Sequence, residues 1–213
     1  MWRCSSWCFH EKQKVLKAFA EVRGIHLPEL FEEDLGGVCQ NMIITVGGYP
    51  GSGKTTLSRK VCNAFGLTHV HAGEIFREMA ARRGVSLEEF SRQAEEDETI
   101  DSEVDRRQKE LARENTVVDG RITAYLVDAD LKIWLSAPLE VRVKRIAARE
   151  DISYRKSFED VTRREASEKK RYKKYYSIDT DDLSVYDLVI NSGLWDAEGV
   201  FRIMKAAIEV REW

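Results

Sequence analysis

The residues GYPGSGKTT, from Gly48 to Thr56, carry most of the information about the fold of this 213-residue chain. They fit the pattern G-x-x-x-x-G-K-[ST]. A short apolar run, MIITV at 42–46, precedes them, and the apolar residues of 57–65 recur at helical spacing. A strand, a glycine-rich turn and a helix in this order predict a loop that binds phosphate.

The chemistry of such a loop depends on its backbone and on two side chains. Glycines lack a Cβ, so the backbone can wrap closely around a phosphate and present its N–H groups and a helix N-terminus to it. Lys54 is predicted to reach the β- and γ-phosphates of ATP, and the Thr55 hydroxyl to bind Mg²⁺. The expected ATP-binding residues are Gly48, Tyr49, Pro50, Gly51, Ser52, Gly53, Lys54, Thr55 and Thr56.

Strand and helix patterns alternate after the loop. The predicted strands are 68–70, 116–119, 131–135 and 186–190, and the predicted helices are 73–83, 87–96, 100–114, 139–149, 158–176 and 196–210. Strands joined by helices favour an α/β fold whose mostly parallel sheet has helices on both faces. In such a sheet ligands bind at the carboxyl ends of the strands, where the loop and Asp119–Arg121 both fall.

Composition and cysteine spacing exclude several classes of protein. The chain is 43% apolar and 33% charged, has a net charge of −3, and has no apolar run near the ~20 residues of a membrane span. We therefore expect a globular chain that binds neither membranes nor nucleic acid. Cys4, Cys8, Cys39 and Cys62 match no zinc pattern, which predicts free thiols and a cytoplasmic location.

Two groups of charged residues follow predicted strands. Arg77 would lie about one turn into the helix after the second strand, where a guanidinium suits a second phosphate; a surface helix start is the alternative. Asp119 and Arg121 stand at the end of strand 116–119. Asp119 could hold Mg²⁺ through water while Arg121 binds a phosphate, or the two could form an ion pair in an exposed turn.

Charge is unevenly distributed along the chain. Residues 86–105 carry nine acids and one base, and residues 141–174 carry thirteen bases and six acids. The arginines of this basic block are Arg142, Arg145, Arg149, Arg155, Arg163, Arg164 and Arg171. The first three share a helix face through their i, i+3, i+7 spacing. A solvated helix face and a clamp over the transferred phosphate both fit the block.

The sequence has no motif for a base that would activate an alcohol. Neither a His-Arg-Asp loop nor an Asn-Lys-x-Asp guanine motif occurs. A phosphate acceptor already carries an ionised oxygen and needs no base. The pattern therefore favours a nucleotide or a similar phosphate as the acceptor.

The chain resembles the cytidylate kinases, especially their compact archaeal type. The resemblance covers residues 42 to about 210 and rests on GYPGSGKTTLSRKV, HAGEIFREMAARRGVSLEEFSRQAEED, TIDSEVDRRQ, VVDGR, DADLKIWLSAPLEVRVKRIAARE, RREASEKKRYKKYYSID and LSVYDLVINSGLW. The loop is common to all P-loop NTPases, whereas AGEIFR, DGR and the DLKIWL segment are more specific. The chain departs from relatives at Tyr49, where they usually have Pro, and at Ile122, where bacterial members often have an Asp that helps to read cytosine.

The resemblance implies a fold, a reaction and a division of the chain. The fold is the three-layer P-loop NTPase fold with a five-stranded parallel sheet. Residues 1–41 would be an extension that catalysis does not need, and 42–213 a nucleoside monophosphate kinase domain, with a monophosphate-binding insertion at about 73–114 and a lid at about 149–164. The enzyme would act as a monomer with Mg²⁺, converting ATP and CMP or dCMP to ADP and CDP or dCDP.

The resemblance also suggests site residues, with base recognition assigned away from Ile122. The expected catalytic residues are Lys54, Arg121, Arg145, Arg149 and Arg164. The expected acceptor-binding residues are Arg77, Asp101, Arg106, Arg107 and Arg121, and the expected metal ligands are Thr55 and Asp119. The alternatives are another small-acceptor kinase of the adenylate or shikimate type, a P-loop ATPase that acts on a partner, and an inactive binding module.

Overall fold

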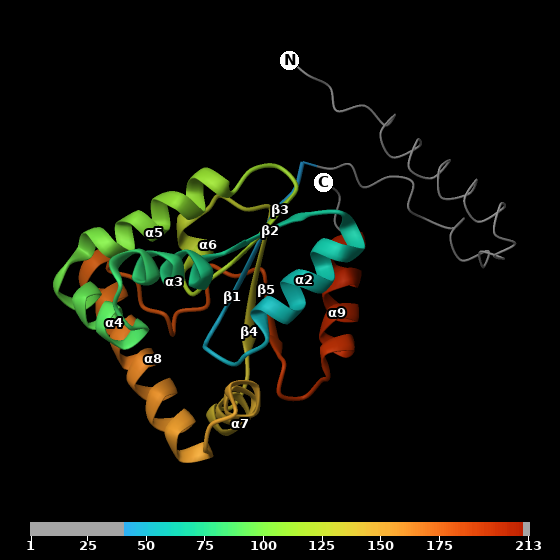
Figure 1. Cartoon of the computed structure of the whole chain (residues 1–213). Coiled ribbons are helices and arrows are strands. Elements are labelled where there is room, and N and C mark those ends of the chain that lie inside the picture. The colour runs from blue at the N-terminus through green and yellow to red at the C-terminus, as the bar shows by residue number, and fades with distance from the viewer. Residues whose placement is uncertain (1–40, 211–213) are drawn as a thin grey trace, which may run out of the picture. The chain divides into compact units, whose positions relative to one another are not determined.

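A five-stranded parallel sheet organises the domain (Figure 1), which confirms the predicted α/β class. The computed structural model describes residues 41–210, so our expectations for residues 1–40 lie outside the described residues. The strands, in the sheet order β2-β3-β1-β4-β5, are β1 (Ile43–Gly48), β2 (Thr68–His71), β3 (Thr116–Asp119), β4 (Leu131–Ser136) and β5 (Leu188–Asn191). The helices are α2 (Lys54–Phe65), α3 (Ala72–Arg83), α4 (Leu87–Glu96), α5 (Glu98–Leu111), α6 (Thr123–Leu126), α7 (Leu139–Glu150), α8 (Tyr154–Tyr176) and α9 (Ala197–Glu209).

The central strand β1 is buried along almost its whole length. Ile44 and Val46 are fully buried in a core that they share with α2 and α9, which lie side by side in Figure 1. A separate aromatic cluster contains Trp134, whose ring lies 5.3 Å from that of Tyr49 and 5.1 Å from that of Tyr186. Fully burying a large apolar side chain stabilises a fold by about 1.5–3 kcal/mol, so these contacts hold β1 and its loop in place.

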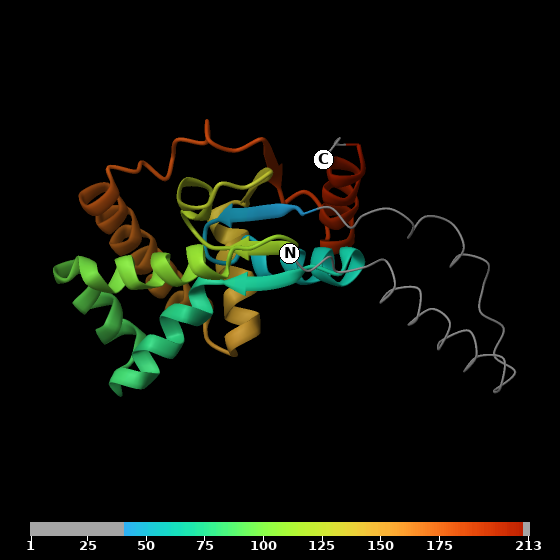
Figure 2. The same cartoon turned by 90° about the horizontal axis from the view of Figure 1, so that it is seen from above.

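The carboxyl ends of the strands meet at one edge of the sheet. Val46 pairs with Asp119 and Gly48 pairs with Leu135 in the parallel register. The loop after β1 and the turn after β3 therefore emerge next to each other. Figure 2 shows the strand arrowheads pointing toward the side where α3, α4, α5 and α8 gather.

Two smaller apolar cores attach these helices. Phe90 and Ile100, both almost fully buried, join α4 and α5 to α3 and to the strands β2 and β3. Val143 and Val161 join α7 to α8. Within the described residues, no helix combines the length and the apolar composition that crossing a bilayer requires.

The long helix α8 begins earlier than the sequence pattern predicted. We expected it to start at residue 158, but it starts at Tyr154 because the Ser153 side chain caps it by accepting a hydrogen bond from the Lys156 backbone N–H. Only residues 151–153 separate α8 from α7. The expected lid region, 149–164, thus comprises the end of α7, this turn and the first half of α8.

Candidate active site

A cavity of about 970 Å³ opens at the carboxyl ends of the strands. Cavities that bind small molecules commonly span about 300–1,000 Å³, so this one lies at the upper end of that range. Its walls come from the loop after β1, the turn after β3, the helices α3, α4, α5, α7 and α8, and the segment that leads from β5 into α9. The predicted site residues that line it are Pro50, Gly51, Ser52, Gly53, Lys54, Thr55, Thr56, Arg77, Asp101, Arg121, Arg145, Arg149 and Arg164.

The glycines of the loop are required by its geometry. A Cβ on Gly48 would lie 2.5 Å from the Leu135 carbonyl oxygen, and one on Gly51 would lie 2.6 Å from the Arg142 carbonyl oxygen. Gly53 has open space around it but a φ of +96°, which side chains rarely adopt. Any other residue at these positions would distort the loop.

Lys54 begins α2 and folds back on the loop. Its Nζ donates hydrogen bonds to the carbonyl oxygens of Gly48, at 2.8 Å, and Tyr49, at 3.2 Å. Burial, and then the positive charge of Arg121, lower the pKa of Lys54 to about 7. A bound phosphate would favour the charged form of Lys54, so an anion in the cavity would raise the pKa of this side chain.

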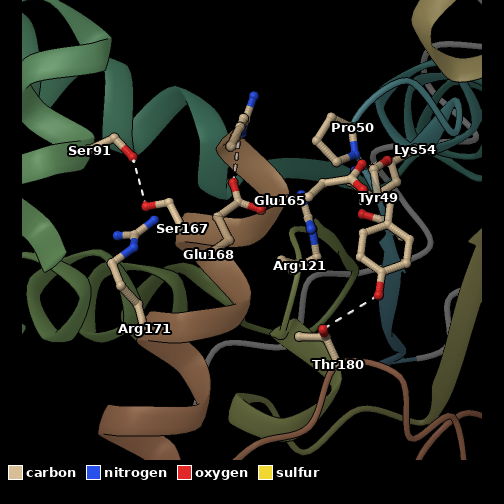
Figure 3. A network of polar contacts seen from close by, with 12 residues as sticks. Tyr49, Pro50, Lys54, Ser91, Arg121, Glu165, Ser167, Glu168, Arg171 and Thr180 are labelled. Carbon is tan, nitrogen blue, oxygen red and sulfur yellow. Dashed lines mark hydrogen bonds and ion pairs between the residues drawn. The ribbon is translucent and has the colours of Figure 1, made fainter. Parts of the chain in front are cut away.

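Arg121, at the end of β3, faces a carboxylate on α8. Its guanidinium forms an ion pair with Glu168, and Arg164 donates to the other oxygen of the same carboxylate at 2.8 Å. Burial tends to raise the pKa of Glu168, but Arg121 and Arg164 outweigh it and lower the value to about 2. In Figure 3, Arg121, Tyr49 and Lys54 lie on one side, and Glu168, on α8, lies on the other. The Arg121 guanidinium also lies 4.9 Å from the centre of the Tyr49 ring.

The arginines of α7 have three different environments. Arg142 is buried, pairs with Glu165 and donates to the Pro50 carbonyl at 3.2 Å, so it holds the backbone of the loop after β1. Arg145 donates to the Ser192 carbonyl at 2.6 Å and lines the cavity. Arg149 also lines the cavity, but its side chain is 67% exposed and pairs with the adjacent Glu150.

The carboxylate of Asp119 is buried between two histidines of β2. His69 lies 2.9 Å from one of its oxygens, and His71 is bonded to the other. Burial alone would raise the pKa of Asp119, but the bonds to His69 and His71 hold it well below its usual range. Asp119 is fully buried and is not among the residues that line the cavity, so a metal ion in the cavity would meet it only through water or after a rearrangement.

The predicted acceptor-binding residues separate into two groups. Arg77 lines the cavity and has no hydrogen bond or ion pair with another described residue. Asp101 also lines it, but Arg171 donates to both of its oxygens, at 2.7 and 2.9 Å. Arg106 and Arg107 instead pair with Glu103 on their own helix and are not among the residues that line the cavity. The structure does not bring these last two arginines to the site.

Several residues that line the cavity were missed by sequence reasoning: Asp105, Gln108, Glu168, Ser192 and Trp195. A signal existed for the first three. Arg164, Glu168 and Arg171 recur at i, i+4, i+7, and so do Asp101, Asp105 and Gln108, which places each set on one helix face. Ser192 and Trp195 follow β5 in a segment with no periodic pattern.

The sequence of the chain is similar to those of known cytidylate kinases. A model of the cytidylate kinase-like family matches residues 43–194. A cytidylate kinase from Pyrococcus horikoshii is 54% identical over 170 residues, which cover 79% of this chain and 88% of that protein. One from Methanocaldococcus jannaschii is 51% identical over 174 residues, covering 79% of this chain and 98% of that protein.

Solved structures with similar folds are more distant in sequence. An uncharacterized protein from Eubacterium ventriosum superposes with a TM-score of 0.56 at 18% identity, covering 80% of this chain and 99% of that one. A shikimate kinase from Bacteroides thetaiotaomicron gives a TM-score of 0.51 at 14% identity, covering 79% of this chain and 99% of that one. At such low identities these two structures show the fold alone.

Proposed function

The chain belongs to the cytidylate kinase-like family, and from this premise we propose that it transfers the γ-phosphate of ATP to CMP or dCMP in the cavity described above. The observation that carries the proposal is that one cavity joins the phosphate-binding loop to Arg77 and Arg121. A kinase of two nucleotides needs both anion sites within reach of each other. An ATPase that acts on a protein partner would not need the second site.

The described residues supply positioning and charge rather than a base. The loop and Lys54 hold the β- and γ-phosphates of ATP, while Arg77 and Arg121 hold the acceptor phosphate in line with them. Negative charge on the transferred group is stabilised by Lys54 and by arginines of α7 and α8, chiefly Arg145, Arg149 and Arg164. The acceptor oxygen is already ionised, so no side chain has to remove a proton.

The residues of the loop fit a role for Mg²⁺. This ion prefers oxygen ligands, keeps several waters, and usually binds one or two carboxylates together with substrate phosphates. Thr55 lines the cavity in the first turn of α2, so its hydroxyl suits direct binding. Asp119, whose oxygens accept from histidines, suits contact through water. When bound, the ion would neutralise charge on the phosphates.

An assay of ADP release across several acceptors tests this function. With ATP and Mg²⁺, we expect turnover with CMP and dCMP, and far less with UMP, AMP or shikimate. Equal release of ADP without any acceptor would instead support an ATPase. Cytoplasmic location, a monomeric state, and the division into an extension at 1–41, an insertion at 73–114 and a lid at 149–164 are part of the same proposal.

A further inference from the structure

We propose that Asp105 and Gln108, which share one face of α5, read the exocyclic amine of cytosine in the acceptor nucleotide. This inference rests on the proposed function, because it takes a cytidine monophosphate as the acceptor in the cavity. It names the residues that distinguish this acceptor from its uracil counterpart.

Both residues are buried yet incompletely hydrogen-bonded. Asp105 and Gln108 are 8% and 2% exposed, and both line the cavity. In the described part of the chain, Asp105 Oδ2 and Gln108 Oε1 have no hydrogen-bond partner. A buried polar atom without a partner costs about 1–3 kcal/mol, so folded proteins keep few of them. Two such oxygens on adjacent turns of a cavity wall indicate that a ligand group donates hydrogen bonds to them.

The chemistry of the pair fixes which ligand group it accepts. Gln108 Nε2 donates to Asp105 Oδ1 at 3.1 Å. Burial raises the pKa of Asp105 to about 6, so the carboxylate is ionised at neutral pH and can only accept hydrogen bonds. The amide of Gln108 must therefore turn its NH₂ toward Asp105, which leaves two acceptor oxygens for the ligand. The Tyr176 hydroxyl, which is itself buried without a hydrogen-bond partner among the described residues, lies near Asp105 and partly offsets the rise in its pKa.

Two acceptors select a base that carries a donor at this edge. Cytosine presents an N4 amine with two hydrogens, whereas uracil presents a carbonyl oxygen at the same place. The amine satisfies both oxygens. The uracil carbonyl would leave them unpartnered and would repel the Asp105 carboxylate, so CMP is favoured over UMP.

Other residues along the same wall are less suited to this role. Both oxygens of Asp101, one turn earlier on α5, are occupied by Arg171. Ile122 lines the cavity but has no polar side-chain atom. Phe76, on α3, lines the same cavity and offers an aromatic surface for the pyrimidine ring. The open polar pair on this wall is therefore the one formed by Asp105 and Gln108.

The substitution Asp105→Asn tests the assignment. Asparagine has the same size, and its amide can donate to the uracil carbonyl. We expect the ratio of kcat/KM for CMP to that for UMP, at saturating ATP, to fall by about 10- to 100-fold. Glu110→Gln is the matched control, because Glu110 lies on α5 but pairs with Arg106 outside the cavity; its ratio should not change. An unchanged ratio in an Asp105→Asn variant that still uses CMP would overturn the inference.

If the variant fails to fold, a measurement on the unaltered chain tests whether the N4 amine of cytosine is recognised. The monophosphate of the 2-pyrimidinone ribonucleoside carries hydrogen in place of the amine. We expect its kcat/KM to lie about 10- to 100-fold below that of CMP, because both acceptor oxygens would stay unpartnered. Equal use of the two compounds would overturn the inference while leaving the proposed function in place. Failure to phosphorylate CMP at all would overturn both.

Discussion

Glu168 on α8 forms an ion pair with Arg121 at the end of β3, and the two side chains are only 7% and 6% exposed. Arg164 reaches the same carboxylate. A cluster of cations that lines the cavity thus contains an internal anion. In a buried pair, removing one partner leaves an uncompensated charge, so this contact should matter for both stability and ligand response.

Glu168→Gln is expected to destabilise the free protein by about 3–5 kcal/mol, because Arg121 would remain buried without its counter-charge. Urea unfolding measures the loss. Inorganic phosphate should restore part of the stability of this variant and do much less for the unaltered chain. Glu159→Gln, which removes an exposed pair with Arg155 on the same helix, should cost under ~1 kcal/mol. Equal losses of stability in the two variants would contradict the claim that Glu168 compensates the buried charge of Arg121.

The same carboxylate predicts a dependence of stability on pH. The pKa of Glu168 is about 2 in the folded chain, below the ~4.3 of an unfolded glutamate. Its contribution is therefore fully present above pH ~4.3 and is lost as the pH falls toward about 2. Unfolding free energies measured across this window should decline less steeply for Glu168→Gln than for the unaltered chain. Parallel slopes would show that Glu168 titrates normally.

Lys54 predicts proton uptake when ATP binds. Its pKa is lowered to about 7, so near pH 7.5 much of the side chain is neutral before ATP binds, whereas the phosphates favour the charged form. We expect about half a proton or more to be taken up per ATP at pH ~7.5, with uptake vanishing well below pH 7. Calorimetry in buffers of different ionisation enthalpy measures this number. Lys54→Arg, whose guanidinium is always charged, should show little uptake. Persistent uptake in that variant would assign the proton to another group.

Arg77→Ala is expected to weaken CMP binding by about 10- to 100-fold, because charge-assisted hydrogen bonds to the monophosphate are lost. The affinity for ATP should stay within about two-fold. Arg82→Ala is the control, since Arg82 is exposed on the same helix, pairs with Glu78 and does not line the cavity. If Arg77→Ala weakened ATP as much as CMP, Arg77 would not mark a separate acceptor site.

Closure of the cavity should be visible by hydrogen exchange. A kinase must exclude water from the transferred phosphate, and Lys156, Arg163 and Arg164 line the cavity from the first half of α8. We expect exchange across residues 149–164 to slow when a CMP–ATP bisubstrate analogue binds, while residues 203–209 of α9, which do not line the cavity, change little. Unchanged exchange at 149–164 would return these side chains to the role of a solvated helix face.

Features set by local sequence were predicted most accurately. The loop from Gly48 to Thr55 was found because its glycine spacing and its flanking strand and helix are short-range properties. Arg121 was placed at the sheet edge because parallel strands end together. The four-residue helix α6 was missed since it is too short to show a period.

Contacts between segments that are distant in the sequence could not be predicted from it. The acidic block at 86–105 and the basic block at 141–174 were evident, but their partners were not. The structure pairs Arg163 with Glu88, Lys170 with Glu95 and Arg171 with Asp101. Three bases of the block are thus neutralised by α4 and α5, whereas others pair with acids inside α7 and α8, such as Arg155 with Glu159 and Lys156 with Asp160. The unpaired oxygens of Asp105 and Gln108 likewise depend on which acids of α5 the basic block pairs with, which the sequence does not show.

The fate of the γ-phosphate of ATP tests the central claim most directly. The unaltered chain is incubated with γ-labelled ATP, Mg²⁺ and CMP, and the labelled products are separated. The account predicts that the label appears in CDP, and that Lys54→Ala, which removes charge stabilisation from the β- and γ-oxygens, lowers the rate more than ten-fold, a loss above ~1.4 kcal/mol. Label recovered as inorganic phosphate, at a rate independent of CMP, would contradict it.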